Sequence, residues 1–93
     1  MTPGKKIYLI RNGETDINVK NLLQGSNVDV SLNETGKKQA ERFYEQYKSV
    51  SFKKIYTSTQ KRSIESVEKF ILDGVPHVEN STTTNGYYVR MSA

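Results

Sequence analysis

Residues 7–15 read IYLIRNGET, a short apolar run that ends abruptly in an arginine, an asparagine and a glycine. The run is too short and too rich in β-branched and aromatic residues for a helix, so we expect a fully buried strand. Gly13 would let the backbone approach a ligand closely, and Arg11 would supply planar, bidentate donors suited to phosphate. The segment therefore predicts a strand that delivers a phosphate-binding loop.

The size and composition of the chain favour a single small domain over residues 1–93. A chain of 93 residues buries only about 60% of the surface that its unfolded form exposes. Hydrophobic residues make up 34% of the chain and charged residues 26%. We expect a modest core and marginal stability.

The net charge of +4 suits an anionic partner, but its distribution argues against nucleic acid. Lysines stand beside glutamates at helical spacing, as in Lys37 with Glu41 and Glu65 with Lys69, which is typical of a solvated helix surface. A basic nucleic-acid binder is therefore the weakest of the function classes considered. The chain has no cysteine, which excludes disulfides and cysteine-based metal sites, and we expect no metal. No segment has the length of apolar sequence that a signal peptide or membrane span requires, so we expect a cytoplasmic protein with no membrane partner.

A long polar loop, residues 12–32, follows the first strand, and long connections in compact domains are usually functional. Asn33 is a good N-cap for an amphipathic helix over about 34–48, whose apolar residues recur at helical spacing. Gly36 in the first turn costs about 1 kcal/mol relative to alanine, so this helix depends on packing for its stability.

A second strand is expected over residues 52–57, followed by a second helix that ends near Gly74. Either Ser58 or the next residue could cap this helix. The remaining segment, residues 78–93, reads as a polar tail in which Tyr87–Val89 could make only a short edge strand.

The order strand, loop, helix, strand, helix requires two strands that run parallel. Loops that leave the carboxyl ends of such strands lie at one edge of the sheet, where ligands bind. This arrangement would bring Arg11 beside Ser58 and Arg62, with an anion held between the arginines and the start of the second helix. An ion pair of Arg11 with Glu14 or Glu65 is the alternative, purely structural interpretation.

Several separated motifs resemble the histidine phosphatase (phosphoglycerate mutase-like) superfamily over about residues 5–77. The first motif of that family is Arg-His-Gly-Glu-Thr, and here Asn12 occupies the position of the nucleophilic histidine. The residues that carry the resemblance are Arg11, Gly13, Glu14, Thr15, Asn18, Gln24, Gly25, Leu32, Gly36, Gln39, Ala40, Ile55, Tyr56, Ser58 and Arg62.

The resemblance implies a three-layer α/β/α fold with a mainly parallel sheet, of which this chain would be the truncated N-terminal portion. It also implies hydrolysis or transfer of phosphate on small phosphomonoesters through a phosphohistidine, without a metal or cofactor. By resemblance the ligand is a small phosphorylated molecule or phosphate, and the phosphate-binding residues are Arg11, Asn18, Gly25, Ser58 and Arg62.

The change at Asn12 predicts a catalytically silent chain, whether it is a natural pseudoenzyme or a mutant. An amide nitrogen cannot attack phosphorus or store a phosphoryl group, and losing a nucleophile costs on the order of 10⁶ in turnover in another covalent system. His77, the one histidine, reads as an ordinary loop residue. The alternative function is a non-catalytic module that binds a phosphate ligand or another protein. Because two strands and two helices leave apolar surface uncovered, we also expect a homo-oligomer or an exchange of elements between copies.

Overall fold

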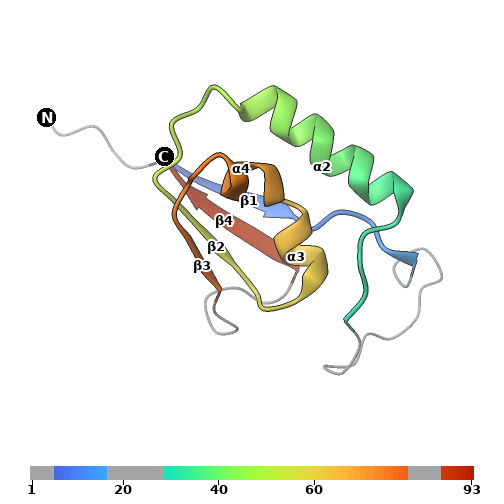
Figure 1. Cartoon of the computed structure of the whole chain (residues 1–93). Helices are drawn as coiled ribbons and strands as arrows, with labels where there is room; N and C mark the ends of the chain where they lie inside the picture. Colours follow the sequence, from blue (N-terminus) through green and yellow to red (C-terminus); the bar gives the residue numbers. More distant parts are fainter. Residues whose placement is uncertain (1–5, 17–28, 80–86) are drawn as a thin grey trace, which may run out of the picture.

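The computed structural model describes residues 6–16, 29–79 and 87–93, which contain a mixed four-stranded sheet (Figure 1). The strands lie in the order β1-β4-β2-β3. β2 pairs in parallel with β3, whereas β4 pairs antiparallel with both β1 and β2. Their bounds are Ile7–Arg11 for β1, Lys54–Thr57 for β2, His77–Glu79 for β3 and Tyr88–Ser92 for β4.

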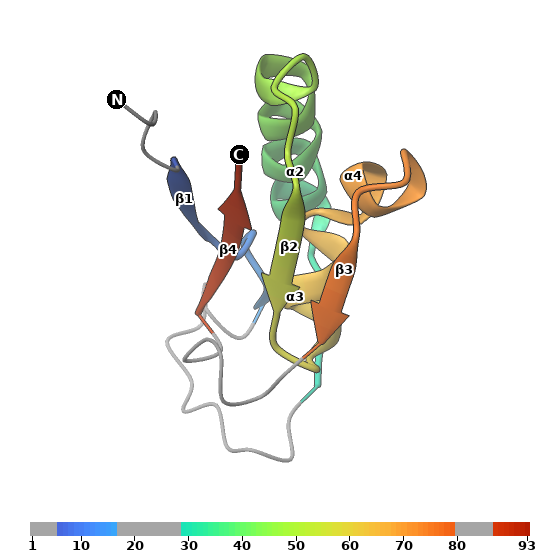
Figure 2. The same ribbon diagram turned by 90° about the vertical axis from the view of Figure 1, so that its left-hand side faces the viewer.

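The expectation of a mainly parallel sheet was wrong, because β4 lies between β1 and β2 (Figure 2). β1 and β2 still run in the same direction, as expected, but they are not neighbours. β4 comes from the segment that we interpreted as a polar tail with at most an edge strand. Its residues Val89 and Met91 are both fully buried and alternate with polar positions. The polar, turn-rich residues before β4 concealed this short alternation.

The helices that lie wholly within the described residues are α2 (Glu34–Tyr47), α3 (Lys61–Glu65) and α4 (Glu68–Leu72). α2 matches the expected helix, and Oδ1 of Asn33 accepts a hydrogen bond from the Gly36 amide at 2.8 Å, as an N-cap should. The turn after α4 contains Gly74 with φ of 99°, which matches the expected helix end. None of the helices in the described ranges is both long enough and apolar enough to cross a membrane.

The expected second helix is divided into α3 and α4, because Val67 leaves the helical conformation at φ −130° and ψ 16°. The hydroxyl of Ser66 donates to the carbonyl oxygen of Arg62, four residues earlier, at 2.6 Å. Serine hydroxyls that bond back to this carbonyl tend to bend helices. The break also directs the Val67 side chain, which is 1% exposed, into the core.

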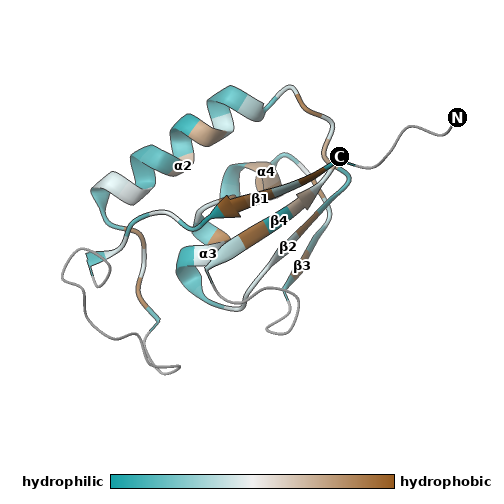
Figure 3. Ribbon diagram, turned by 180° about the vertical axis from the view of Figure 1, so that it is seen from behind, coloured by the Kyte–Doolittle hydropathy of each residue, from teal (hydrophilic) through white to brown (hydrophobic). Residues whose placement is uncertain are grey.

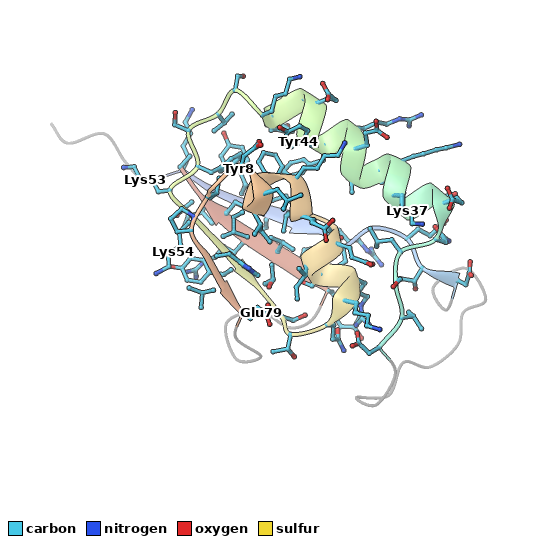
Figure 4. The ribbon with its side chains drawn as sticks, in the orientation of Figure 1. Tyr8, Lys37, Tyr44, Lys53, Lys54 and Glu79 are labelled. Atoms are coloured by element: carbon cyan, nitrogen blue, oxygen red, sulfur yellow. The ribbon has the colours of Figure 1, made fainter. Side chains whose placement is uncertain are left out.

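The core lies between the sheet and the three helices, which cover the same face of it (Figures 1 and 2). The described residues thus form two layers, and the expected third layer is not seen among them. The side chain of Tyr44 extends from α2 toward α4 and forms an edge contact with the ring of Phe70 (Figure 4). The buried residues of the core are Phe52, Ile55, Val67, Phe70, Val89 and Met91.

β1 is an edge strand and not the fully buried strand that we expected. Ile7 is 58% exposed and Leu9 69% exposed, and they alternate with Tyr8 and Ile10, which pack on the core, so they point to the face opposite the helices. Brown marks the apolar residues of β1 in Figure 3. Tyr8 points to the other face and makes edge contacts with Tyr47 and Phe52. An apolar run of this length fits both a buried strand and an edge strand, so the sequence alone could not distinguish these two positions in a sheet.

Candidate functional site

The loop that follows β1, residues 12–16, is here called the Gly13 loop. Its central contact is a hydrogen bond from the Gly13 amide to Oγ of Ser66 at 2.9 Å, which is buried. The Ser66 hydroxyl in turn donates to the carbonyl oxygen of Arg62. Two hydrogen bonds therefore connect the residues that follow β1 to the helix that carries Arg62.

The opposite side of the Gly13 loop is attached to the start of α2. The Glu14 amide donates to Oε1 of Gln39 at 2.9 Å, and the Glu14 carbonyl oxygen accepts from the Asn33 amide at 3.0 Å. A Cβ atom added to Gly13 would lie 2.9 Å from the Gly36 carbonyl oxygen, and one added to Gly36 would overlap the Glu14 backbone. The two glycines allow the loop to contact the helix through its backbone.

Arg62 is a buried cation, 5% exposed, in α3. Burial lowers the pKa of its guanidinium, and the charges of Tyr87 and Asp29 act in the opposite direction. An arginine remains protonated in proteins, so the positive charge persists. Asp29 also lies at the start of α3, where its Oδ1 accepts from the Lys61 amide at 2.8 Å.

Arg11 lies exposed at the end of β1, opposite Tyr88. Leu9 of β1 and Tyr56 of β2 both pair with Arg90 of β4. Arg11, the last residue of β1, and Ser58, the residue after β2, therefore lie at the same level of the sheet. With one strand between them, their backbones are about 10 Å apart. Arg62 lies in α3, which follows Ser58, so Arg11 and Arg62 belong to segments that leave the same edge of the sheet.

The alternative ion pairs of Arg11 are absent among the described residues. The carboxylate of Glu14 accepts from Nδ2 of Asn33 at 3.1 Å, and that of Glu65 accepts from the Leu32 amide at 2.9 Å. Within the described ranges, the only ion pairs are Lys37 with Glu34 and Lys48 with Glu45, both on α2.

Ser58 is buried in the turn between β2 and α3. Its amide donates to Oγ of Ser63 at 3.2 Å, and its own Oγ accepts from the Gln60 amide at 3.3 Å. The N-cap of α3 is Gln60, so the expectation that Ser58 or its neighbour caps the helix was wrong. α3 has five residues, and we therefore assign no anion-binding role to its N-terminus.

Asn12 follows Arg11, and the backbone amide of Asn12 donates to the Tyr87 carbonyl oxygen at 2.8 Å. A cavity of about 180 Å³ adjoins it, between the Gly13 loop and α2. Neither Arg62 nor Ser58 lines this cavity, and Asn18 and Gly25 lie outside the described residues. The lining residues are Ile10, Arg11, Asn12, Gly13, Gln39, Ala40, Phe43 and Ser66.

His77 is the first residue of β3 and not the loop residue that we expected. Its Nε2 lies 2.7 Å from Oγ1 of the buried Thr57, so it joins the neighbouring strands away from the Gly13 loop. The run of three strand residues was too short to recognise.

Sequence reasoning missed Ser66 and Asp29. Ser66 follows Arg62 by one helical turn, a spacing that could have indicated a contact with the Arg62 carbonyl. No local signal identifies Gly13 as its second partner, because 53 residues separate the two.

Comparison with known proteins adds a finding that is independent of this geometry. Residues 7–81 match the sequence model of the histidine phosphatase superfamily (branch 1). A probable phosphatase of Schizosaccharomyces pombe is 39% identical over 66 residues, which are 71% of this chain and 31% of that protein. A 2,3-bisphosphoglycerate-dependent phosphoglycerate mutase of Streptomyces avermitilis is 43% identical over 65 residues, 68% of this chain and 25% of the relative.

A third relative is the fructose-2,6-bisphosphatase TIGAR B of Danio rerio, 35% identical over 62 residues, which are 67% of this chain and 24% of that protein. The chain thus spans about a quarter to a third of the length of the curated relatives that it matches.

Proposed function

Because this chain belongs to the histidine phosphatase superfamily and resembles its N-terminal portion, we propose that it supplies a phosphate-binding site for a small phosphorylated molecule. The names of its relatives support this class of ligand, since they include a phosphatase, a phosphoglycerate mutase and a fructose bisphosphatase. In this proposal Arg11 and Arg62 are the two cationic ligands of one phosphate group.

The observation that carries the proposal is the burial of Arg62 in a helix that two hydrogen bonds of Ser66 connect to the Gly13 loop. Holding a guanidinium at 5% exposure costs free energy, because a charged group loses water when it is buried. A bidentate contact with a bound phosphate would add to the interactions that stabilise this buried charge. Arg11, at the neighbouring loop, would then contact the same anion from the exposed side.

We propose further that this chain binds phosphate without forming a phosphohistidine. In the family, by resemblance, an imidazole nitrogen attacks phosphorus as the bond to the ester oxygen breaks, and that oxygen takes a proton. Asn12 at this position has no nucleophilic nitrogen, because its lone pair is delocalised into the amide carbonyl. Turnover should therefore fall by a factor on the order of 10⁶ from that of a relative with the histidine.

Two measurements test the proposal. In a buffer without phosphate, inorganic phosphate at ten times its Kd should stabilise the protein by about 1.4 kcal/mol, or raise its Tm by about 6 to 11 °C. Arg11→Ala should abolish this shift, whereas Arg42→Ala, which removes an equally exposed arginine from α2, should preserve it. Para-nitrophenyl phosphate should not be hydrolysed.

Absence of any phosphate-dependent shift in the unmodified chain would overturn the proposed site. Hydrolysis at the rate of a relative that has the histidine would overturn the proposed loss of chemistry.

A second candidate function is a protein-interaction module, which the exposure of Ile7 and Leu9 on one face of β1 favours. Exposed apolar positions on an edge strand are typical of surfaces that pair with another chain. Sedimentation equilibrium should then show self-association that Leu9→Lys abolishes. A monomer at every concentration would exclude association between copies of this chain.

A further inference from the structure

We propose that Ser66 is a positioning residue that couples the Gly13 loop to Arg62, so that both proposed phosphate ligands are held in one geometry. This inference rests on the proposed phosphate site. The Ser66 hydroxyl bonds to two backbone groups, the Gly13 amide and the Arg62 carbonyl oxygen, and so acts through the backbone of the segments that carry Arg11 and Arg62.

The two hydrogen bonds of Ser66 are directional and depend on each other. A serine hydroxyl has one proton and two lone pairs. Here the proton goes to the Arg62 carbonyl oxygen at 2.6 Å, which turns a lone pair toward the Gly13 amide at 2.9 Å. Losing the hydroxyl would therefore leave the Gly13 amide without this acceptor and free the Arg62 carbonyl from this donor.

The hydrogen bond between Ser66 and the Gly13 amide is buried. Ser66 is 4% exposed, and the Gly13 loop above it is closed on its other side by Gly36. A buried amide without an acceptor costs more than the hydrogen bond itself contributes, so the loop would move to find another partner. Arg11 lies two residues before Gly13, and the same movement would shift its guanidinium.

The same hydroxyl helps to define where α3 ends. The backbone amide of Ser66 also donates to the Arg62 carbonyl oxygen, at 3.2 Å, so this oxygen accepts two hydrogen bonds from one residue. The chain leaves the helical conformation at the next residue, Val67, whose side chain enters the core. Arg62 thus stands one turn before a fixed break, with the Gly13 loop attached at that point.

If Ser66 had only a structural role, replacing it would lower stability and leave the affinity of the folded protein for phosphate unchanged. The test therefore compares affinity with stability in three variants. Ser66→Ala removes both hydrogen bonds, and Ser66→Thr restores the hydroxyl. Met91→Ala, a core truncation in β4, lowers stability without touching either bond.

Isothermal titration calorimetry with inorganic phosphate, at a temperature where each variant is folded, gives the readout. We expect Ser66→Ala to raise the Kd about five- to tenfold, the equivalent of one buried hydrogen bond. Ser66→Thr should return the Kd to within about twofold of the original, and Met91→Ala should leave it unchanged.

Equal Kd values for Ser66→Ala and the unmodified chain would overturn the role of Ser66 while leaving the phosphate site intact. No phosphate binding by the unmodified chain would instead overturn the proposed function. If Ser66→Ala does not fold, the inference is tested on the unmodified chain by measuring how fast the Gly13 amide hydrogen exchanges with solvent. Phosphate at ten times its Kd should slow that exchange about tenfold if opening of the loop abolishes binding, and an unchanged rate would contradict the inference.

Discussion

The Gly13 amide donates a 2.9 Å hydrogen bond to the buried hydroxyl of Ser66, across 53 residues of sequence. This contact joins the end of an edge strand to the helix that carries the one buried arginine of the described residues. Through it, the two segments most similar to phosphate-binding motifs lie on the same side of the molecule. The proposed phosphate site depends on that juxtaposition.

We predict that Gly36→Ala destabilises the protein, although alanine is the better helix former. The propensity gain is about 1 kcal/mol, but the added methyl group would overlap the Glu14 backbone, which cannot withdraw while it is bonded to Gln39. Overpacking costs about 1 to 3 kcal/mol, and an overlap with backbone atoms lies at the upper end of that range, so we expect a net loss of about 2 kcal/mol.

Urea unfolding followed by circular dichroism measures this loss. Lys38→Ala, at an exposed position of the same helix, should change the free energy of unfolding by less than about 0.5 kcal/mol. A Gly36→Ala protein as stable as the original would show that the Gly13 loop does not pack against α2 in this way.

We predict that Met91→Ala lowers the free energy of unfolding by about 2 to 5 kcal/mol. Met91 is fully buried in the central strand β4, whereas the sequence alone had placed it in a polar tail. Leu72→Ala removes a side chain of similar size that is 76% exposed, and should have little effect. Equal effects of the two substitutions in urea unfolding would contradict the central position of β4.

The elements recognised from the sequence are those whose signals are local. Asn33 caps α2 because its side chain bonds to an amide three residues away, and Gly74 ends the second helical segment because it adopts a positive φ. Both depend on a few adjacent residues. Sequence reasoning therefore placed α2 and this helix end correctly.

The elements that were missed depend on contacts between distant segments. β4 has five residues and becomes a central strand because β1 and β2 both pair with it. The break at Val67 and the position of the Gly13 loop both involve Ser66, whose partners include a residue 53 positions away. Periodicity and propensity carry no information about such pairings.

We predict that Asp29→Asn tightens phosphate binding about two- to threefold. Burial lowers the pKa of Arg62 and the charge of Asp29 partly opposes this effect, so the carboxylate is near enough to compete with an anion there. Asparagine keeps the oxygen that accepts from the Lys61 amide. The gain should shrink as salt is added, because an exposed charge is screened. Glu68→Gln on α4 is the charge-matched control, and a weaker affinity for Asp29→Asn would contradict the assignment of Arg62 as a phosphate ligand.

We predict an alkaline loss of stability that involves Tyr44. Its hydroxyl donates to Asp73 at 2.5 Å, and this hydrogen bond raises the pKa of Tyr44 above its ordinary value of 10.0. A pKa raised in the folded state contributes stability below pH 10, and that contribution disappears as the pH rises through the higher folded pKa. The difference in unfolding free energy between the original and Tyr44→Phe should therefore be constant near neutrality and shrink above pH 10. A difference that grows above pH 10 would contradict the hydrogen bond.

The central claim, that Arg11 and Arg62 bind one phosphate group, is tested most directly by titrating the isotope-labelled protein with inorganic phosphate and following both arginine side chains by NMR. The account predicts that the Nε–H signals of Arg11 and Arg62 and the Gly13 amide shift together along curves that give a single Kd. Signals that shift with different midpoints, or a shift of one arginine without the other, would contradict it.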